Sequence, residues 1–202
     1  MANERISIEL MNELRKMHQL DSFLKTYSFI HDEQNRRQYA NTLSGLLEIA
    51  DGFNQKRTPY VVIGGLAVMA YTAQGNPDKG IITEWRGTDD IDLLSNKSDA
   101  EQILRSAGYK FGQRISGKKG TGCIYNYIKN LNGEQAIVGL RENVELKNRD
   151  ITDKILANST CVGIYGVPIR VPNMKDLIAL KLDANREKDR KDVKELRKVY
   201  NI

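Results

Sequence analysis

Two short stretches decide the fold: Tyr60-Val-Val-Ile-Gly-Gly-Leu-Ala-Val-Met-Ala-Tyr71 and Arg86-Gly-Thr-Asp-Asp-Ile-Asp-Leu93. The first stretch opens with an apolar, β-branched run that is typical of a buried strand. Gly64 and Gly65 interrupt this run, and the residues after them are typical of a helix that begins directly at the glycines. Because glycine has no Cβ, backbone N–H groups at such a helix start can approach an anion closely. A glycine pair alone also fits a plain tight turn.

The second stretch places two acids on a predicted strand over residues 91–94. Residues two apart on a strand point to the same side, so Asp90 and Asp92 project together while Ile91 faces the core. Two adjacent carboxylates repel each other unless a cation lies between them, and such oxygen ligands suit Mg²⁺. The alternative is an exposed edge with scattered acids, but the apolar Leu93 and Leu94 disfavour it. The pattern therefore predicts a magnesium site.

The remaining sequence predicts helices around a small sheet. Apolar residues at helical spacing predict helices in the first third, the last of them over residues 33–53. Asn132-Gly133 and Gly166 are hairpin signals. Further predicted elements are a helix over 100–107, strands over 125–131, 135–138, 162–165 and 168–171, a helix over 151–158, and a charged helical region over 174–200 with a break near Asn185.

The bulk composition is that of a globular protein. Lys and Arg number 31 against 26 Asp and Glu, giving a net charge of +5, which weakly favours phosphate-bearing partners. No apolar run approaches the roughly 18 residues of a membrane span, and the N-terminus lacks a secretory pattern. We therefore expect a cytoplasmic protein that makes no membrane contact. Cys123 and Cys161 lack zinc-site spacing.

The segment from Ile63 to Leu93 resembles the nucleotidyltransferase superfamily, which has the polymerase-β-like fold. That pattern places Gly-Gly or Gly-Ser after a first strand and Asp-x-Asp on a second. The Arg-x-Thr-x-Asp-Ile-Asp form here is similar to the AbiEii-like nucleotidyltransferases, which include toxins of bacterial toxin–antitoxin systems. Downstream, Lys181-x-x-Ala184 and Arg186-x-Lys-Asp-x-x-Asp192 resemble that family's C-terminal motif. The resemblance covers about residues 37 to 200.

The resemblance implies an α+β fold whose core is a small mixed β-sheet. Residues 1–57 would form an N-terminal helical region, residues 58–172 the nucleotidyltransferase core, and residues 173–202 a C-terminal helical region packed on the core. It also implies transfer of a nucleoside monophosphate from an NTP, such as ATP, to an acceptor hydroxyl, with two Mg²⁺ ions during turnover.

The resemblance also assigns roles to residues. Asp90 and Asp92 would bind the metal, and Gly64 and Gly65 would hold the terminal phosphates. Lys181 would contact a phosphate, and Asp189 and Asp192 would brace Lys181 or Arg186. The residues that the resemblance implies as nucleotide-binding are Gly64, Gly65, Arg86, Thr88, Lys181, Arg186 and Asp189.

A third carboxylate is usual in this superfamily, on a later strand. Glu145, in Val144-Glu-Leu146, has the expected surroundings and is predicted as a third metal ligand and catalytic residue. The alternative strand, Ala136-Ile-Val138, has no acid. Without Glu145 the site would have two carboxylates, which suffices for metal and nucleotide binding but weakens the case for catalysis.

The acceptor is left open by the sequence. The interpretations are tRNA or another RNA, with a toxin role and a cognate antitoxin; a non-catalytic nucleotide- or RNA-binding module; and a small-molecule transferase of the antibiotic type. The segment Gly112–Lys119 nearly spells a phosphate-binding P-loop, but Lys119 stands where Ser or Thr is needed. Residues 114–122 are instead predicted as a basic surface loop.

Overall fold

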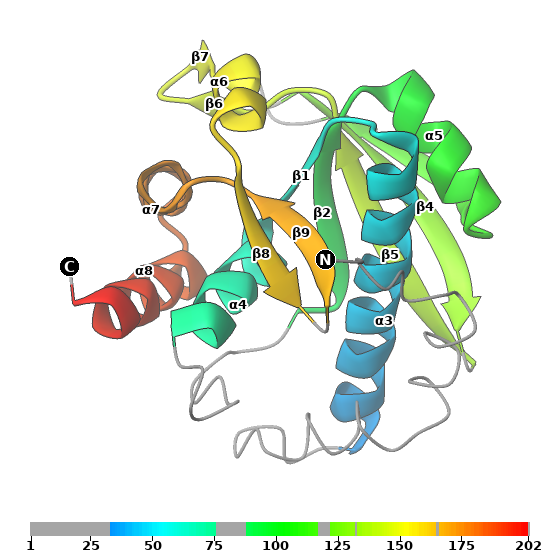
Figure 1. Ribbon diagram of the computed structural model, residues 1–202, viewed down its shortest axis with the longest axis horizontal. Helices are drawn as coiled ribbons and strands as arrows, with labels where there is room; N and C mark the ends of the chain where they lie inside the picture. The colour runs from blue at the N-terminus through cyan, green and yellow to red at the C-terminus, as the bar shows by residue number, and fades with distance from the viewer. Residues whose placement is uncertain (1–32, 76–87, 117–121, 132, 165, 202) are drawn as a thin grey trace, which may run out of the picture.

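The computed structural model describes residues 33–75, 88–116, 122–131, 133–164 and 166–201. The helices predicted before residue 32, and Arg86, lie outside these ranges. Figure 1 shows the arrangement of the elements. In chain order they are α3 (Glu33–Lys56), β1 (Tyr60–Ile63), α4 (Gly64–Gly75), β2 (Asp90–Ser95), α5 (Lys97–Ser106), β3 (Lys110–Ser116), β4 (Cys123–Leu131), β5 (Glu134–Arg141), β6 (Glu145–Leu146), β7 (Arg149–Asp150), α6 (Thr152–Ala157), β8 (Thr160–Ile164), β9 (Val167–Val171), α7 (Met174–Ala184) and α8 (Glu187–Tyr200).

A mixed five-stranded sheet with the order β1-β2-β5-β4-β3 forms the centre of the fold. β1 runs antiparallel to β2, and β2 runs parallel to β5, although β3 and β4 lie between them in the chain. The predicted β4–β5 hairpin is present: Leu131 pairs with Glu134, and Gly133 has a φ of +87°. The predicted α+β class with a small mixed sheet is confirmed.

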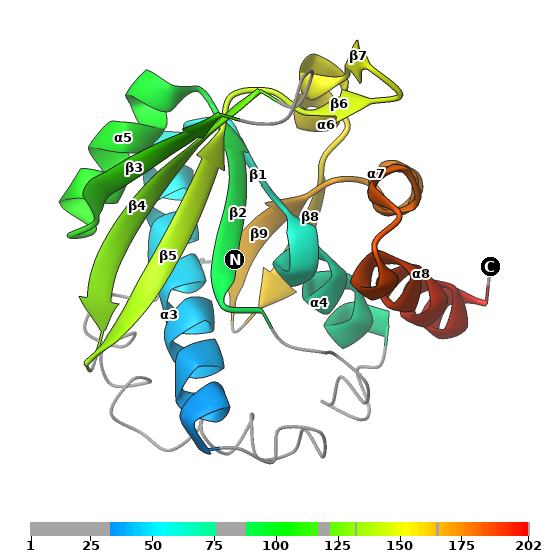
Figure 2. The same cartoon turned by 180° about the vertical axis from the view of Figure 1, so that it is seen from behind.

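Helices cover one face of this sheet. α3 and α5 pack on that face, in front of the sheet in Figure 1 and behind it in Figure 2. The strand residues that point toward them, such as Ile91, Tyr127 and Val138, are fully buried. On the opposite face, Ile124 and Asn126 of β4 are only partly buried. The sheet therefore has a packed face and, in its β3–β5 half, a more open one.

The C-terminal helices lie at the β1 side of the sheet, with α7 packed on α8. α8 packs on α4, and the Tyr200 hydroxyl donates a hydrogen bond to the Tyr71 carbonyl at 3.0 Å. The predicted break is present: Asn185, between α7 and α8, has a left-handed φ of 48°. The three-part division of the chain stays a prediction.

β3 is an edge strand where the sequence predicted a loop from residue 114 onward. All seven of its residues are exposed, and its register with β4 shifts between Phe111 and Gln113. An exposed strand with a bulge carries no alternating burial pattern, so its sequence resembles a loop. Most of the P-loop-like segment thus lies in this strand. Residues 117–121 lie outside the described ranges.

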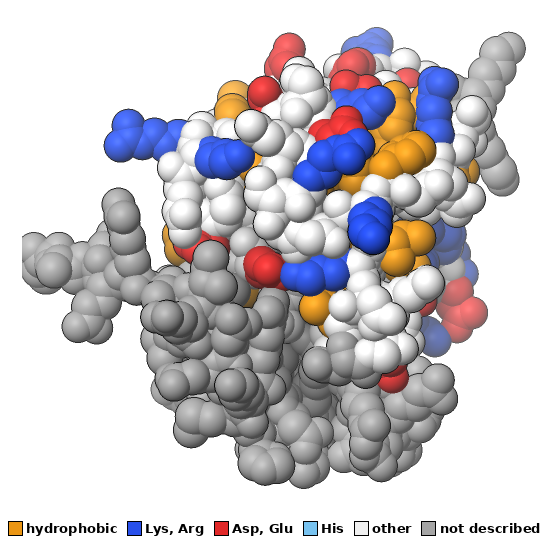
Figure 3. Space-filling model, turned by 90° about the vertical axis from the view of Figure 1, so that its right-hand side faces the viewer, with side chains coloured by type: hydrophobic (Ala, Val, Ile, Leu, Met, Phe, Trp, Pro, Cys, Tyr) orange, Lys and Arg blue, Asp and Glu red, His pale blue; other side chains and the backbone are white. Residues whose placement is uncertain are grey.

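One described face of the molecule is of mixed charge. On the side that faces right in Figure 1, Lys and Arg side chains lie beside Asp and Glu, with small apolar patches between them (Figure 3). No helix in the described ranges combines the length and apolar character needed to cross a lipid bilayer.

Candidate active site

The turn from β1 into α4 is built around Gly64. Its φ is +73°, a backbone conformation that L side chains rarely adopt. A Cβ added there would lie 2.5 Å from Asp92 Oδ2, because the β1–β2 register pairs Ile63 with Asp92. Glycine is therefore required both by backbone conformation and by space. The start of α4, with N–H groups that have no intrahelical partner, consequently lies directly beside the second acid of the Asp-x-Asp pair.

Asp90 and Asp92 lie on β2 with the predicted orientation. Ile91 is fully buried, whereas Asp90 is exposed and Asp92 partly exposed, so the two acids share the face opposite the core. The buried Thr88 donates from its hydroxyl to Asp90 Oδ1 at 2.6 Å. This contact fixes the orientation of the Asp90 carboxylate and leaves its second oxygen available for another ligand.

The environment of Asp92 is unfavourable to its negative charge. Burial raises the pKa of Asp92 above its ordinary value, and the neighbouring Asp90 carboxylate raises it further. The Arg141 guanidinium acts in the opposite direction, through a 3.3 Å contact from Nη2 to Asp92 Oδ1. A divalent cation between the two aspartates would relieve the remaining excess of negative charge.

The strand next to the aspartates is β5, and it brings no acid to them. Gly139 stands opposite Asp92, and a Cβ added to it would lie 3.4 Å from Asp92 Oδ1. Glu145 lies instead in β6, which pairs only with β7 in a separate ribbon. Across the described ranges no three acid, His or Cys side chains gather in a way that could hold a metal ion. The role of Glu145 as third carboxylate thus stays a prediction, and its expected place beside Asp92 is occupied by Gly139.

A cavity of about 330 Å³ opens beside these residues. Its lining residues come from β1, α4, β2, β5 and β6 on one side and from the C-terminal helices on the other. They include Gly64, Asp92, Arg141, Glu145, Lys181, Asp183, Arg186 and Asp189. The structure thus brings most of the predicted site residues to one cavity, although they are up to 125 positions apart in the chain.

The C-terminal motif forms a buried ionic cluster at the cavity wall. Lys181, which is 5% exposed, lies with its Nζ 2.6 Å from Asp192 Oδ2 and 3.4 Å from Asp189 Oδ1. Arg186 donates to both carboxylate oxygens of Asp189, from Nε at 2.6 Å and from Nη2 at 3.1 Å. Burial by itself would raise the pKa of Asp189, but the hydrogen bonds from Arg186 and the charge of Lys181 hold it below its ordinary value. The predicted bracing of Lys181 and Arg186 by these aspartates is present.

Sequence reasoning missed Arg141 and Gly139. Both lie on β5 on the same face as Asp92, two positions apart. The available signal was a charged residue at the end of an apolar strand, which by itself does not show which strand it adjoins.

Comparison with known proteins identifies the family. A family model described as nucleotidyl transferase of unknown function (DUF2204) matches residues 42–202. The chain belongs to this family. No curated protein sequence matches it. The AbiEii-like subtype stays a prediction.

Solved structures show the same nucleotidyltransferase fold. The antibiotic-resistance factor ANT(2'')-Ia has a TM-score of 0.51 at 14% identity, covering 79% of this chain and 84% of that one. A Thermotoga maritima protein described as a nucleotidyltransferase has a TM-score of 0.51 at 19% identity, covering 80% and 93%. The lincosamide antibiotic adenylyltransferase LnuA has a TM-score of 0.50 at 14% identity, covering 77% and 96%. At these identities the likeness shows the fold alone.

Proposed function

We propose that this protein transfers a nucleoside monophosphate from an NTP to an acceptor hydroxyl, with Mg²⁺ held by Asp90 and Asp92. The observation that carries the proposal is the approach of Gly64 to Asp92, where a single methyl group would not fit. It sets the start of α4 beside the carboxylate pair. A triphosphate bound there by backbone N–H groups would share its oxygens with a metal on the aspartates.

The residues present fit Mg²⁺. This ion often uses one or two carboxylates and completes its octahedron with water and substrate phosphates. Asp90 is exposed and oriented by Thr88, and Asp92 faces the cavity with an elevated pKa. When bound, the metal would neutralise charge on the triphosphate and on the attacking oxygen.

The chain's own residues would position the reactants. Gly64 and Gly65 would bind the terminal phosphates, and the cavity would orient the NTP for in-line attack. The acceptor oxygen forms a bond to the α-phosphorus, the bond from that phosphorus to the bridging oxygen breaks, and pyrophosphate leaves with that electron pair. The hydroxyl proton passes to solvent. Lys181, Arg186 and Asp189 would hold α7 and α8 as the wall of this cavity.

For the acceptor we propose tRNA or another RNA. The support is α8, whose buried face holds Asp189, Asp192, Val193 and Leu196. Its exposed side chains include the cations Lys188, Arg190, Lys191, Lys194, Arg197 and Lys198. Such a row suits a phosphate backbone. As the biological role we propose a cytoplasmic toxin with a cognate antitoxin, and this rests on the resemblance to AbiEii-like proteins.

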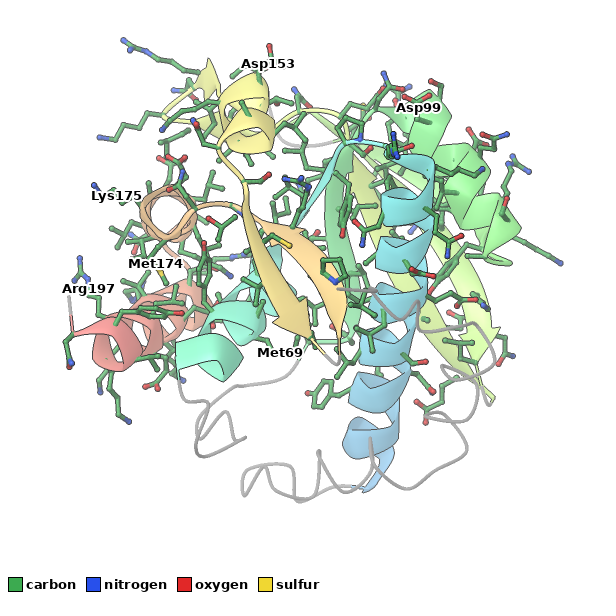
Figure 4. All side chains as sticks on the ribbon, in the orientation of Figure 1. Met69, Asp99, Asp153, Met174, Lys175 and Arg197 are labelled. Carbon is green, nitrogen blue, oxygen red and sulfur yellow. The ribbon has the colours of Figure 1, made fainter. Side chains whose placement is uncertain are left out.

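The test is label transfer. The protein is incubated with each α-labelled NTP, Mg²⁺ and total tRNA or total RNA, and both labelled RNA and released pyrophosphate are measured. We expect transfer with at least one NTP, loss of transfer with EDTA, and loss of more than a hundredfold in the double variant Asp90→Asn, Asp92→Asn. Asp99→Asn is the matched control, because Asp99 is an exposed acid on α5, which packs on the covered face of the sheet (Figure 4). Transfer that survives in the double variant, or none with any NTP and acceptor, would refute the proposal.

A second candidate is a nucleotide- or RNA-binding module without turnover. It is favoured by Gly139, which stands beside Asp92 where a third carboxylate would otherwise lie. This module would bind Mg²⁺ and NTP with the same residues and release no pyrophosphate. Equilibrium binding together with a pyrophosphate assay separates the two functions.

A further inference from the structure

Among the residues that the structure describes, three cations line the cavity beside the aspartates, and they differ in how they are paired. Lys181 contacts two aspartates, and Arg186 has two of its nitrogens on Asp189. Arg141 makes its contact to Asp92 at 3.3 Å, near the long end of hydrogen-bond distances. Within the described ranges, the Nε of Arg141 is buried and has no hydrogen-bond partner.

A buried donor without a partner is costly, so an unpaired donor in a side chain that lines a cavity points to a ligand there. Lys181 is 5% exposed and already occupied by Asp189 and Asp192, whereas the Arg141 side chain is 26% exposed. Arg186 is more exposed, at 61%, but two of its three side-chain nitrogens already contact Asp189. In the part of the chain that the structure describes, Arg141 lines the cavity with one long contact to Asp92 and a buried Nε that is left unpaired.

The register of the sheet fixes the position of Arg141. β5 places Gly139 opposite Asp92 and Arg141 opposite Leu94, so Arg141 follows Asp92 along the same face of the sheet. Gly64 and Arg141 both line the cavity, on either side of Asp92. An anion held by the start of α4 would therefore lie within the volume that the guanidinium borders. The planar guanidinium presents paired donors that match the oxygens of a phosphate.

We propose that Arg141 binds a phosphate group of the nucleotide, and that Asp92 holds Arg141 in place; a divalent cation, when bound, would compete with Arg141 for this carboxylate. This inference rests on the proposed function and names a specificity-determining residue for its anionic substrate. The phosphate contact of Lys181 stays a prediction; in the structure its Nζ lies on Asp189 and Asp192, which joins α7 to α8.

The proposal predicts effects of opposite sign on two ligands. Arg141→Gln removes a cation next to the metal carboxylates, so Mn²⁺ alone, as a probe for the divalent ion, should bind about two- to tenfold more tightly. The same change removes charge-assisted hydrogen bonds to phosphate, so inorganic tripolyphosphate and NTP should bind about ten- to a hundredfold more weakly. A residue with only a structural role would weaken the binding of both ligands.

Isothermal titration of the whole chain with Mn²⁺ alone, tripolyphosphate with Mg²⁺, and each NTP with Mg²⁺ measures these affinities. Arg105→Gln is the matched control, because it removes the same charge from an exposed arginine paired with Glu101 on α5. Arg141→Lys keeps the charge, so Mn²⁺ affinity should return to the wild-type value while tripolyphosphate affinity recovers only in part. This variant also keeps the proposal testable should Arg141→Gln fail to fold.

Phosphate affinities unchanged within twofold in both Arg141 variants, or a joint loss of Mn²⁺ and phosphate binding, would overturn the proposal. A change confined to the affinity for the RNA acceptor would overturn it as well. Label transfer reports separately on the proposed function. A wild-type protein that binds NTP through Arg141 but transfers no label would refute the transferase and leave this inference standing.

Discussion

Replacing Gly64 with alanine gives the most direct test of the site geometry. The new Cβ would lie 2.5 Å from Asp92 Oδ2, about 0.9 Å short of an ordinary contact, which begins near 3.4 Å. Asp92 or the start of α4 must therefore move by several tenths of an ångström. Misplacement of a reacting group by about 1 Å can cost a hundredfold in rate. We expect a loss of that order in nucleotide transfer, together with weaker binding of Mn²⁺ and NTP.

Gly64→Ala has two effects that must be separated: strain in the left-handed backbone and the clash of the new Cβ with Asp92. A left-handed conformation costs an alanine about 1–2 kcal/mol more than a glycine. Gly133 has a similar positive φ of +87°, and an added Cβ there meets nothing within 4 Å. Gly133→Ala should therefore lower the free energy of unfolding by about as much as the backbone strain in Gly64→Ala does, without disturbing any neighbour.

The assay pairs thermal unfolding with titration of Mn²⁺ and NTP. Both variants should unfold at lower temperature than the wild type, and only Gly64→Ala should lose ligand binding. Wild-type ligand binding in Gly64→Ala, or equal losses in Gly133→Ala, would show that the approach of Gly64 to Asp92 is not what shapes the site.

Three further predictions concern the C-terminal helices. Lys181→Met removes the cation from a buried ionic cluster and should destabilise the protein by about 3–5 kcal/mol, measured by chemical denaturation. The control is Lys175→Met, at an exposed position of the same helix, which should change stability by less than about 0.5 kcal/mol. The pKa of Asp189 is lower in the folded than in the unfolded chain, so its stabilisation is present above about pH 4 and is lost as the pH falls through the folded value. Asp189→Asn should therefore lower the free energy of unfolding more at pH 7 than in acid. A difference from the wild type that stays the same as the pH falls would contradict this. Replacing Lys194 and Arg197 with serine should weaken tRNA binding and make the fall of log K with log salt less steep, by about 1.5 in the slope. NTP affinity should not change and serves as the control.

Local sequence determined the elements that depend on neighbours in the chain. The β-branched run with its glycine pair specified β1 and the start of α4, because strand propensity and the absence of a Cβ are local properties. Asn132-Gly133 specified a hairpin for the same reason. The alternation around Ile91 correctly placed Asp90 and Asp92 on one face, since side chains two apart on a strand share a side.

The sequence also predicted the break near Asn185, which places Lys181 on one helix and Asp189 and Asp192 on the next. Their ion pairs required only that α7 and α8 pack against each other. β3 was not readable, because an exposed, bulged edge strand shows no burial pattern.

Tertiary structure alone decided what surrounds Asp92. Alternation along a strand shows which face a residue takes, but not which strand lies beside it. The parallel pairing of β2 with β5 passes over two intervening strands, and it sets Gly139 and Arg141 beside the aspartates while Glu145 leaves the sheet in β6. The sequence by itself thus determined the glycine turn and the acid pair. Only the packing of distant strands decided that Gly139 and Arg141 of β5 lie beside Asp92.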